Sequence, residues 1–252
     1  MISALYVVFA VAHAAIWLWG VRAARRVAWP WPLTLVLVAA APLWYENLRV
    51  GLGRAMGEGP LLYALSVPAL AWHWTALPLF VVAAYGIVRG AGLPWARTPV
   101  AVGATVVVGG ALVAIDLPYA LGVLFGPLGP IPEVELRLGC IGDAIRYTAS
   151  LSPAYFCGPE AEVHRVGPGP LVAIVMNVAV LGVGVALWAQ RGWRWLALAA
   201  GAMFVAAAGG PAWGTYAPPV ANVGEIGLVA ALIATAARFP TAARSATAAR
   251  AA

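Results

Sequence analysis

The stretch AVGATVVVGGALVAIDLPY, from Ala101 to Tyr119, decides the class of protein. Its first fifteen residues carry no charge, and a single carboxylate, Asp116, follows them. An apolar segment of about twenty residues can cross the hydrocarbon core of a bilayer as a helix. The same composition extends along the 252-residue chain, which is 63% hydrophobic and only 10% charged. Since a soluble domain carries about 25% charged residues, the sequence predicts a polytopic integral membrane protein.

Similar apolar windows recur on both sides of this stretch and predict an all-α bundle of seven transmembrane helices. They form one membrane domain over residues 1–238, with an outer cap loop at about 122–169 and a disordered cytoplasmic tail at 239–252. The sixth span is expected to be the shortest. The predicted spans are residues 2–20, 31–48, 66–88, 99–121, 170–190, 194–210 and 219–237.

The arginines are distributed unequally between the loops, and this distribution predicts the orientation. All fifteen basic residues are arginine. Loops one, three and five and the C-terminal tail hold ten of them and no carboxylate, whereas the alternate loops hold five arginines with seven carboxylates. Arginine-rich loops remain in the cytoplasm, so we expect the N-terminus outside and the C-terminus inside a plasma (inner) membrane. The net charge of +6 therefore indicates membrane lipids rather than nucleic acid as the partner.

The first apolar segment is interpreted as a retained helix rather than a signal peptide. Its arginine cluster, Arg22 to Arg26, follows the apolar core, whereas a signal peptide carries basic residues before the core. The two cysteines, Cys140 and Cys157, both lie in the predicted outer loop. An oxidising compartment favours a disulfide between them, worth about 3 kcal/mol for a loop of this length. We also expect a short helix around Asp143–Ser150.

Polar side chains gather at one depth of the predicted bundle. They lie within about 10–12 Å of the outer boundary, at 1.5 Å of rise per residue, while the inner halves of the spans are almost purely apolar. Ionisable groups avoid lipid, so these side chains are expected to face a shared pocket that opens outward beneath the cap loop. The polar groups are Glu46 and Asn47 in the second span, His73 in the third, Asp116 in the fourth, Asn177 in the fifth, and Asn222 with Glu225 in the seventh.

The stretch WYENLRVGLGRAMGEG, from Trp44 to Gly59, is predicted to form one wall of this pocket, with its glycines in a short re-entrant or interfacial turn. Carboxylates and imidazole in a pocket of low dielectric suit acid–base work. Amides and guanidinium groups suit orientation of a ligand. The predicted catalytic residues are Glu46, His73, Asp116 and Glu225, and the predicted ligand-binding residues are Asn47, Arg49, Arg54, Asn177 and Asn222.

Metal and cofactor motifs give little support to other chemistries. Glu46, His73, Asp116 and Glu225 are ligand types that bind zinc, iron or manganese, but their spacing matches no helical metal motif, so the presence of a divalent metal stays open. A retinal Schiff base is excluded because it needs a lysine, and the chain has none. Phosphate-binding loops and the G-x-S-x-G serine motif are also absent from the sequence.

The functional hypothesis is binding of a lipid-like or small polar ligand, with or without acid–base or metal-assisted processing. The sequence does not decide whether the protein is an enzyme. A proton- or ion-coupled transporter would also use intramembrane carboxylates, although it needs a polar path to the cytoplasm. A structural or sensory subunit of a larger membrane complex remains the third alternative, because Gly109–Gly110 and Gly209–Gly210 suit close helix packing.

Overall fold

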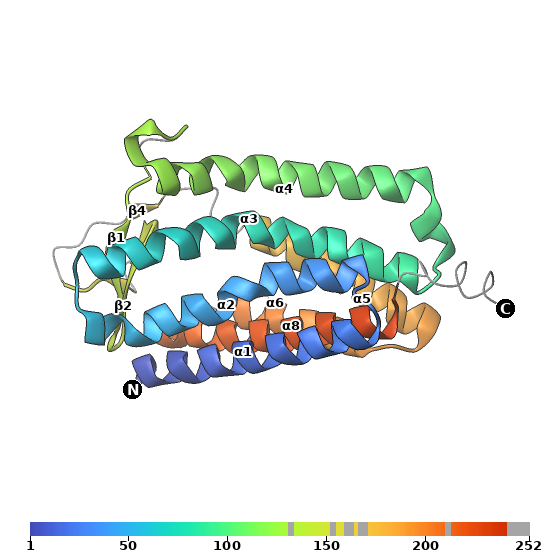
Figure 1. Cartoon of the computed structure of the whole chain (residues 1–252), viewed down its shortest axis with the longest axis horizontal. Coiled ribbons are helices and arrows are strands. Elements are labelled where there is room, and N and C mark those ends of the chain that lie inside the picture. The colour runs from blue at the N-terminus through green and yellow to red at the C-terminus, as the bar shows by residue number, and fades with distance from the viewer. Residues whose placement is uncertain (131–133, 152–154, 159–163, 166–170, 210–212, 241–252) are drawn as a thin grey trace.

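The computed structural model describes residues 1–130, 134–151, 155–158, 164–165, 171–209 and 213–240. Within these ranges the protein is a bundle of long helices with a small β-structure at one end (Figure 1). The helices are α1 (Ile2–Arg26), α2 (Trp31–Met56), α3 (Pro60–Gly90), α4 (Pro99–Phe125), α5 (Leu171–Arg191), α6 (Trp195–Ala208) and α8 (Ala217–Arg238). Short 3-10 turns are η1 (Pro94–Arg97), η2 (Gly126–Leu128) and η4 (Gly214–Tyr216).

Five of these helices, α1, α3, α4, α5 and α8, are long and apolar enough to cross a membrane. This confirms an all-helical, multi-pass membrane protein in the described part of the chain. The helix α6 has 14 residues, which at 1.5 Å per residue is shorter than a hydrocarbon core of about 30 Å. The helix α2 is long, but charged and amide side chains lower the hydropathy of its C-terminal half. These residues are Glu46, Asn47, Arg49 and Arg54.

The helices lie side by side, and α2 and α3 occupy the middle of the bundle (Figure 1). Their buried faces contribute Leu33, Val36 and Ile87 to one core, which Leu187 of α5 and Leu232 of α8 complete. The helix α4 packs mainly along α3 at one edge of the bundle. Only 17% of its most apolar window is buried, as expected for a helix that faces lipid.

At the end of the bundle where α8 finishes, side chains at and after the end of α5 bind neighbouring segments. Arg191, at the end of α5, donates to the carbonyl oxygens of Ala91 (2.8 Å) and Gly92 (3.0 Å), which follow α3. The indole of Trp193 donates to Thr235 Oγ1 at 2.9 Å. The third and fifth loops therefore meet on one side of the bundle, and they are two of the loops predicted to be cytoplasmic.

The polar stretch from Trp44 to Gly59 is helical up to Met56, so the predicted short turn is limited to residues 57–59 and the placement of Gly51 and Gly53 in it was wrong. The helix α2 continues to Met56, and α3 begins at Pro60 directly after a three-residue connection. Gly51 and Gly53 lie within α2, where each faces a closely packed neighbouring segment. A Cβ at Gly51 would meet the backbone of α1 at Ser3 and Val7. Both helices are therefore longer at this end than the apolar windows predicted.

The predicted cap loop contains two small antiparallel sheets. The first pairs β1 (Arg137–Ile141) with β2 (Ala144–Thr148), and the second pairs β3 (Ser150–Leu151) with β4 (His164–Arg165). The short helix expected around Asp143–Ser150 was therefore wrong. Ile141 pairs with Ala144 across the two-residue turn Gly142–Asp143, and Gly142 has a φ of 58°. A two-residue hairpin needs such a left-handed residue, and glycine adopts it without strain.

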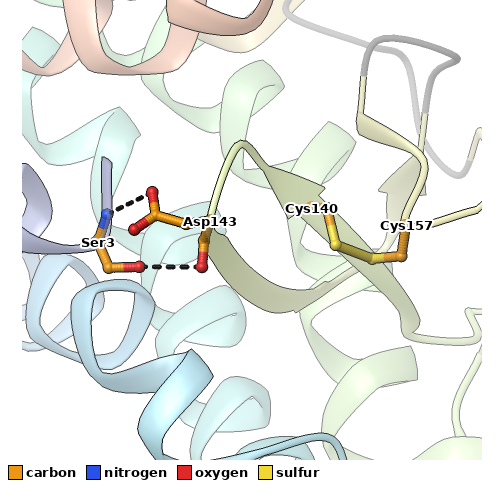
Figure 2. Close-up of a disulfide and its surroundings, with 4 residues drawn as sticks. All are labelled: Ser3, Cys140, Asp143 and Cys157. Carbon is orange, nitrogen blue, oxygen red and sulfur yellow. Dashed lines mark hydrogen bonds between the residues drawn. A yellow bond between two sulfur atoms is a disulfide. The ribbon is translucent and has the colours of Figure 1, made fainter. Parts of the chain in front are cut away.

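The predicted disulfide between Cys140 and Cys157 is confirmed. It joins β1 to the segment that follows β3 (Figure 2). Residues 131–133, 152–154, 159–163 and 166–170 of this region lie outside the described residues, as does most of the predicted tail, 241–252.

The hairpin of β1 and β2 is anchored to the start of α1 through its turn residue Asp143 (Figure 2). The Asp143 carboxylate accepts hydrogen bonds from the backbone amides of Ile2 (2.6 Å) and Ser3 (3.3 Å), and it contacts the Met1 amino group. Ser3 Oγ donates to the Asp143 carbonyl at 3.0 Å. Asp143 thus satisfies helical N–H groups that lack an intrahelical acceptor. The Met1 amino group, followed by the backbone amides of Ile2 and Ser3, lowers the pKa of the Asp143 carboxyl from 3.8 to about 2.

The first prediction concerns the contact between α2 and the hairpin. A Cβ on Gly53 would collide with the carbonyl oxygen of Ile145, a backbone atom that cannot rotate away. Gly53→Ala should therefore lower the free energy of unfolding by about 1–3 kcal/mol. Gly103→Ala is the matched control, since nothing lies within 4 Å of its added methyl group, and it should stabilise α4 by about 0.5–1 kcal/mol. Unfolding in mixed micelles measures both, and equal effects would contradict the close contact.

The second prediction concerns Asp143. Because its folded pKa of about 2 lies below the ordinary value of 3.8, its contribution to stability is complete above about pH 4 and is lost as the pH falls toward 2. Asp143→Ala should speed amide exchange in residues 137–148 roughly fivefold at neutral pH, comparable to the loss of a helix N-cap. Asp143→Asn keeps an acceptor for the Ile2 amide, so its exchange rate should fall between those of the parent and of Asp143→Ala. Hydrogen–deuterium exchange, corrected for intrinsic rates, tests this, and unchanged protection in Asp143→Ala would exclude the anchor.

Candidate functional site

A cavity of about 600 Å³ lies at the hairpin end of the bundle. Residues from α1, α2, α3, α5, α6 and α8 line it, together with the end of the hairpin. Its size is typical of sites that bind small molecules. A second hollow of about 380 Å³, between α3, α4 and α5, is lined mainly by valine and alanine. The polar lining of the larger cavity consists of Tyr6, Glu46, Asn47, His73, Arg146, Thr148, Asn177, Asn222 and Glu225.

Glu46 and His73 form the most direct polar contact in this cavity. His73 Nδ1 lies 3.0 Å from Glu46 Oε2, which is hydrogen-bond distance. The two side chains come from the neighbouring helices α2 and α3, and they are only 19% and 32% exposed. A carboxylate bonded to one imidazole nitrogen orients the ring and leaves Nε2 for another partner. The pair can therefore hold a proton and present it to a molecule in the cavity.

Glu225 adds a second carboxylate from α8. Its Oε2 lies 3.6 Å from Nε2 of His13, which belongs to α1 and is almost fully buried. This distance is longer than a good hydrogen bond, and His13 Nε2 has no hydrogen-bond partner within the described residues. Glu225 itself lines the cavity, whereas His13 is not among its lining residues. The cavity thus has one histidine–carboxylate pair that is bonded and a second that is close but not bonded.

All three asparagines of the chain line the same cavity. The sequence analysis placed the three asparagines, Asn47, Asn177 and Asn222, at one depth. In the structure they line the same cavity as Glu46, His73 and Glu225. Asn47 and Asn177 are almost completely buried, at 3% and 5% exposure. Their roles in ligand binding stay a prediction.

The remaining predicted residues lie elsewhere. Arg49 is buried and donates to Ser66 Oγ at 2.7 Å and to the carbonyl of Tyr147 at 3.4 Å, so it ties α2 to α3 and to β2. Arg54 is exposed near the end of α2. Asp116 is 5% exposed in α4, a helix that contributes no residue to the lining of the cavity. It interacts with His73 only through electrostatics.

Sequence reasoning missed Tyr6, Arg146 and Thr148 as lining residues. Arg146 was counted only as a loop charge, because the hairpin that positions it at the cavity was expected to be a helix. The alternating pattern of residues 137–148 around Gly142–Asp143 is a hairpin signal that could have placed it. Tyr6 lies near the start of α1, and the sequence analysis did not consider it.

The four residues considered as metal ligands do not form a metal centre in the described part of the chain. There, no group of three or more histidine, cysteine, aspartate or glutamate side chains is placed to hold an ion. Glu46 with His73 and Glu225 with His13 are separate pairs, and Asp116 joins neither. The geometry therefore favours proton transfer or hydrogen bonding over metal coordination at these side chains.

Comparison with models of known families, with curated proteins and with solved structures gave no match for this chain. The interpretation of the cavity consequently depends on its own chemistry.

Proposed function

We propose that this protein binds a lipid-like ligand in the cavity at the hairpin end, and that Glu46, His73 and Glu225 carry out acid–base work on it. The observation that carries the proposal is the arrangement of these three side chains, from α2, α3 and α8, around one cavity of about 600 Å³. Ionisable groups inside a membrane protein are costly and are retained mainly where they serve a site.

The lining supports an amphiphilic ligand because its two ends differ in polarity. Glu46, His73 and Glu225 lie toward the hairpin. Leu77 and Phe80 follow His73 by one and two turns along α3, away from the hairpin, and they line the same cavity. A molecule with a polar group and an apolar part would match this gradient.

The chemistry of the polar end suits transfer of a proton. Glu46 fixes Nδ1 of His73 at 3.0 Å, so Nε2 is the nitrogen that can give a proton to the ligand or accept one from it. Glu225 is an acid or base of opposite role on another wall. Pairs of titratable groups in different surroundings commonly divide these two roles. Asp116 would act only indirectly, through its electrostatic interaction with His73.

We also propose that all seven α-helices of the described residues cross or enter the plasma (inner) membrane, with the N-terminus outside. Two observations support this orientation. The start of α1 and the hairpin lie at one end of the bundle (Figure 1), and the arginine-rich third and fifth loops meet at the other. Positive charge in loops stays in the cytoplasm. The cavity would then open outward, with α2 and the short apolar helix α6 completing the bundle.

The ligand and the roles of the carboxylates are tested together. The purified protein should carry an amphiphile at one per chain, detected by native mass spectrometry. Glu46→Gln and Glu225→Gln should each reduce its retention roughly tenfold or more, the effect of about 1.4 kcal/mol, because each removes a charged acceptor from the cavity. Glu58→Gln, an exposed carboxylate on the α2–α3 connection, is the matched control. Retention equal to the parent in both cavity variants would sink the proposal, and Asp116→Asn shows whether that residue takes part.

The orientation has its own test. A fluorescent protein fused after residue 252 should fold and fluoresce, because that fusion point is expected in the cytoplasm. A cysteine introduced at Glu58 should react with a membrane-impermeant maleimide in intact cells, whereas one at Arg97 should react only after lysis. Labelling of the Arg97 position in intact cells would reverse the proposed topology.

A further inference from the structure

The orientation of the three cavity asparagines is fixed by chemistry. Each side-chain amide nitrogen donates to a backbone carbonyl: Asn47 to Leu43 (2.8 Å), Asn177 to Ala200 (3.3 Å) and Asn222 to Pro218 (2.9 Å). A carbonyl oxygen accepts but cannot donate. The atom that faces it must therefore be the amide nitrogen, which leaves the oxygen of each asparagine as the group offered elsewhere.

Two of these amide oxygens are buried without a partner. Oδ1 of Asn47 and Oδ1 of Asn177 have no hydrogen-bond partner among the described residues, and the hydroxyl of Tyr6 shares this condition. All three side chains line the cavity, and all three are at most 5% exposed. A buried polar atom without a partner costs free energy, and in a folded protein it calls for an explanation. A ligand that donates hydrogen bonds supplies one.

The neighbouring charges add to this pattern. The carboxylates of Glu46 and Glu225 are further acceptors on the same walls. One positive side chain, Arg146 of β2, also lines the cavity, where it interacts electrostatically with Tyr6 and Glu46. The walls therefore offer mostly acceptors, with one guanidinium that suits an anionic group such as phosphate.

We propose that the ligand is a single-chain amphiphile whose polar head donates hydrogen bonds through N–H or O–H groups and carries an anionic group beside Arg146. Asn47 and Asn177 accept from the head group, and the apolar chain extends along Leu77, Phe80 and Leu228. This inference rests on the proposed function and adds the chemical class of the ligand. The cavity volume of about 600 Å³ is that of a small-molecule site, which favours one chain over two.

The test compares two probes that differ in their N–H donors and in the bulk of the ammonium group. Lysophosphatidylethanolamine and lysophosphatidylcholine of the same acyl chain share the phosphate, the positive charge and one glycerol hydroxyl, but methylation removes every N–H from choline. The full chain is kept in dimethyldodecylamine-oxide micelles, whose neutral head group has no donor, and binding is titrated by native mass spectrometry. We expect the ethanolamine probe to bind at least tenfold more tightly, and lysophosphatidylglycerol, a hydroxyl donor, also to exceed the choline probe.

Asn47→Leu and Asn177→Leu identify the acceptors. Each variant should lower the preference for the ethanolamine probe to less than threefold while affinity for the choline probe changes little. A preference that survives in both variants would overturn the assignment of these amides. Monodisperse elution and an unchanged melting profile select the variants that are folded.

Two blocking variants separate this inference from the proposed function. Ala221→Trp and Ala173→Phe fill the cavity from α8 and α5, so one that folds suffices. If blocking abolishes binding of both probes and the parent binds them equally, the donor preference is wrong but the cavity still binds an amphiphile. If blocking leaves binding unchanged, the probes bind elsewhere and the proposed function fails as well.

Discussion

A charged side chain at the centre of a bilayer costs about 2.5–3.5 kcal/mol on insertion scales, and this cost decides where the carboxylates of this protein can lie. Glu46 meets His73 across the α2–α3 contact, and Glu225 approaches His13 between α8 and α1. Each pair joins two helices that are adjacent in the bundle. Glu46, His73 and Glu225 line the same cavity, whereas His13 is not among its lining residues.

The hairpin completes the cavity because it is fixed from three directions. Asp143 binds the first amides of α1, the disulfide joins β1 to Cys157, and Arg49 of α2 donates to the carbonyl of Tyr147. The absence of a side chain at Gly53 lets the strand backbone approach α2 closely. A two-stranded hairpin alone is marginally stable in water, so these contacts determine its position. Its position in turn determines where Arg146 enters the cavity.

The sequence was sufficient to place the long apolar helices along the chain, but not for the direction in which each side chain points. Counting residues from the predicted boundaries placed Asp116 and Glu225 at similar depths. Only Glu225 lines the cavity, because α4 packs along one side of α3 and leaves the cavity to the other helices. A helix that is apolar all round carries no sequence signal for its rotation.

The extent of α2 and α3 and the shape of the cap were missed for different reasons. Glycines at 51 and 53 were interpreted as turn residues, whereas they allow close packing inside a helix. The cap was misjudged because the Gly142–Asp143 turn was not recognised. The cysteine pair could be predicted, since two cysteines on one face leave one pairing.

The two kinds of polar side chain in the cavity suit different tasks. An asparagine whose amide nitrogen already donates to a backbone carbonyl offers a fixed acceptor, whatever the pH. A histidine bonded to a carboxylate changes its hydrogen-bonding character when it gains or loses a proton. A site made only of histidine and glutamate would alter its recognition of a ligand at each proton transfer. In the proposed function, Asn47 and Asn177, which line the same cavity as Glu46 and His73, would keep the head group bound while the proton moves, which is the physical requirement for combining binding with acid–base chemistry.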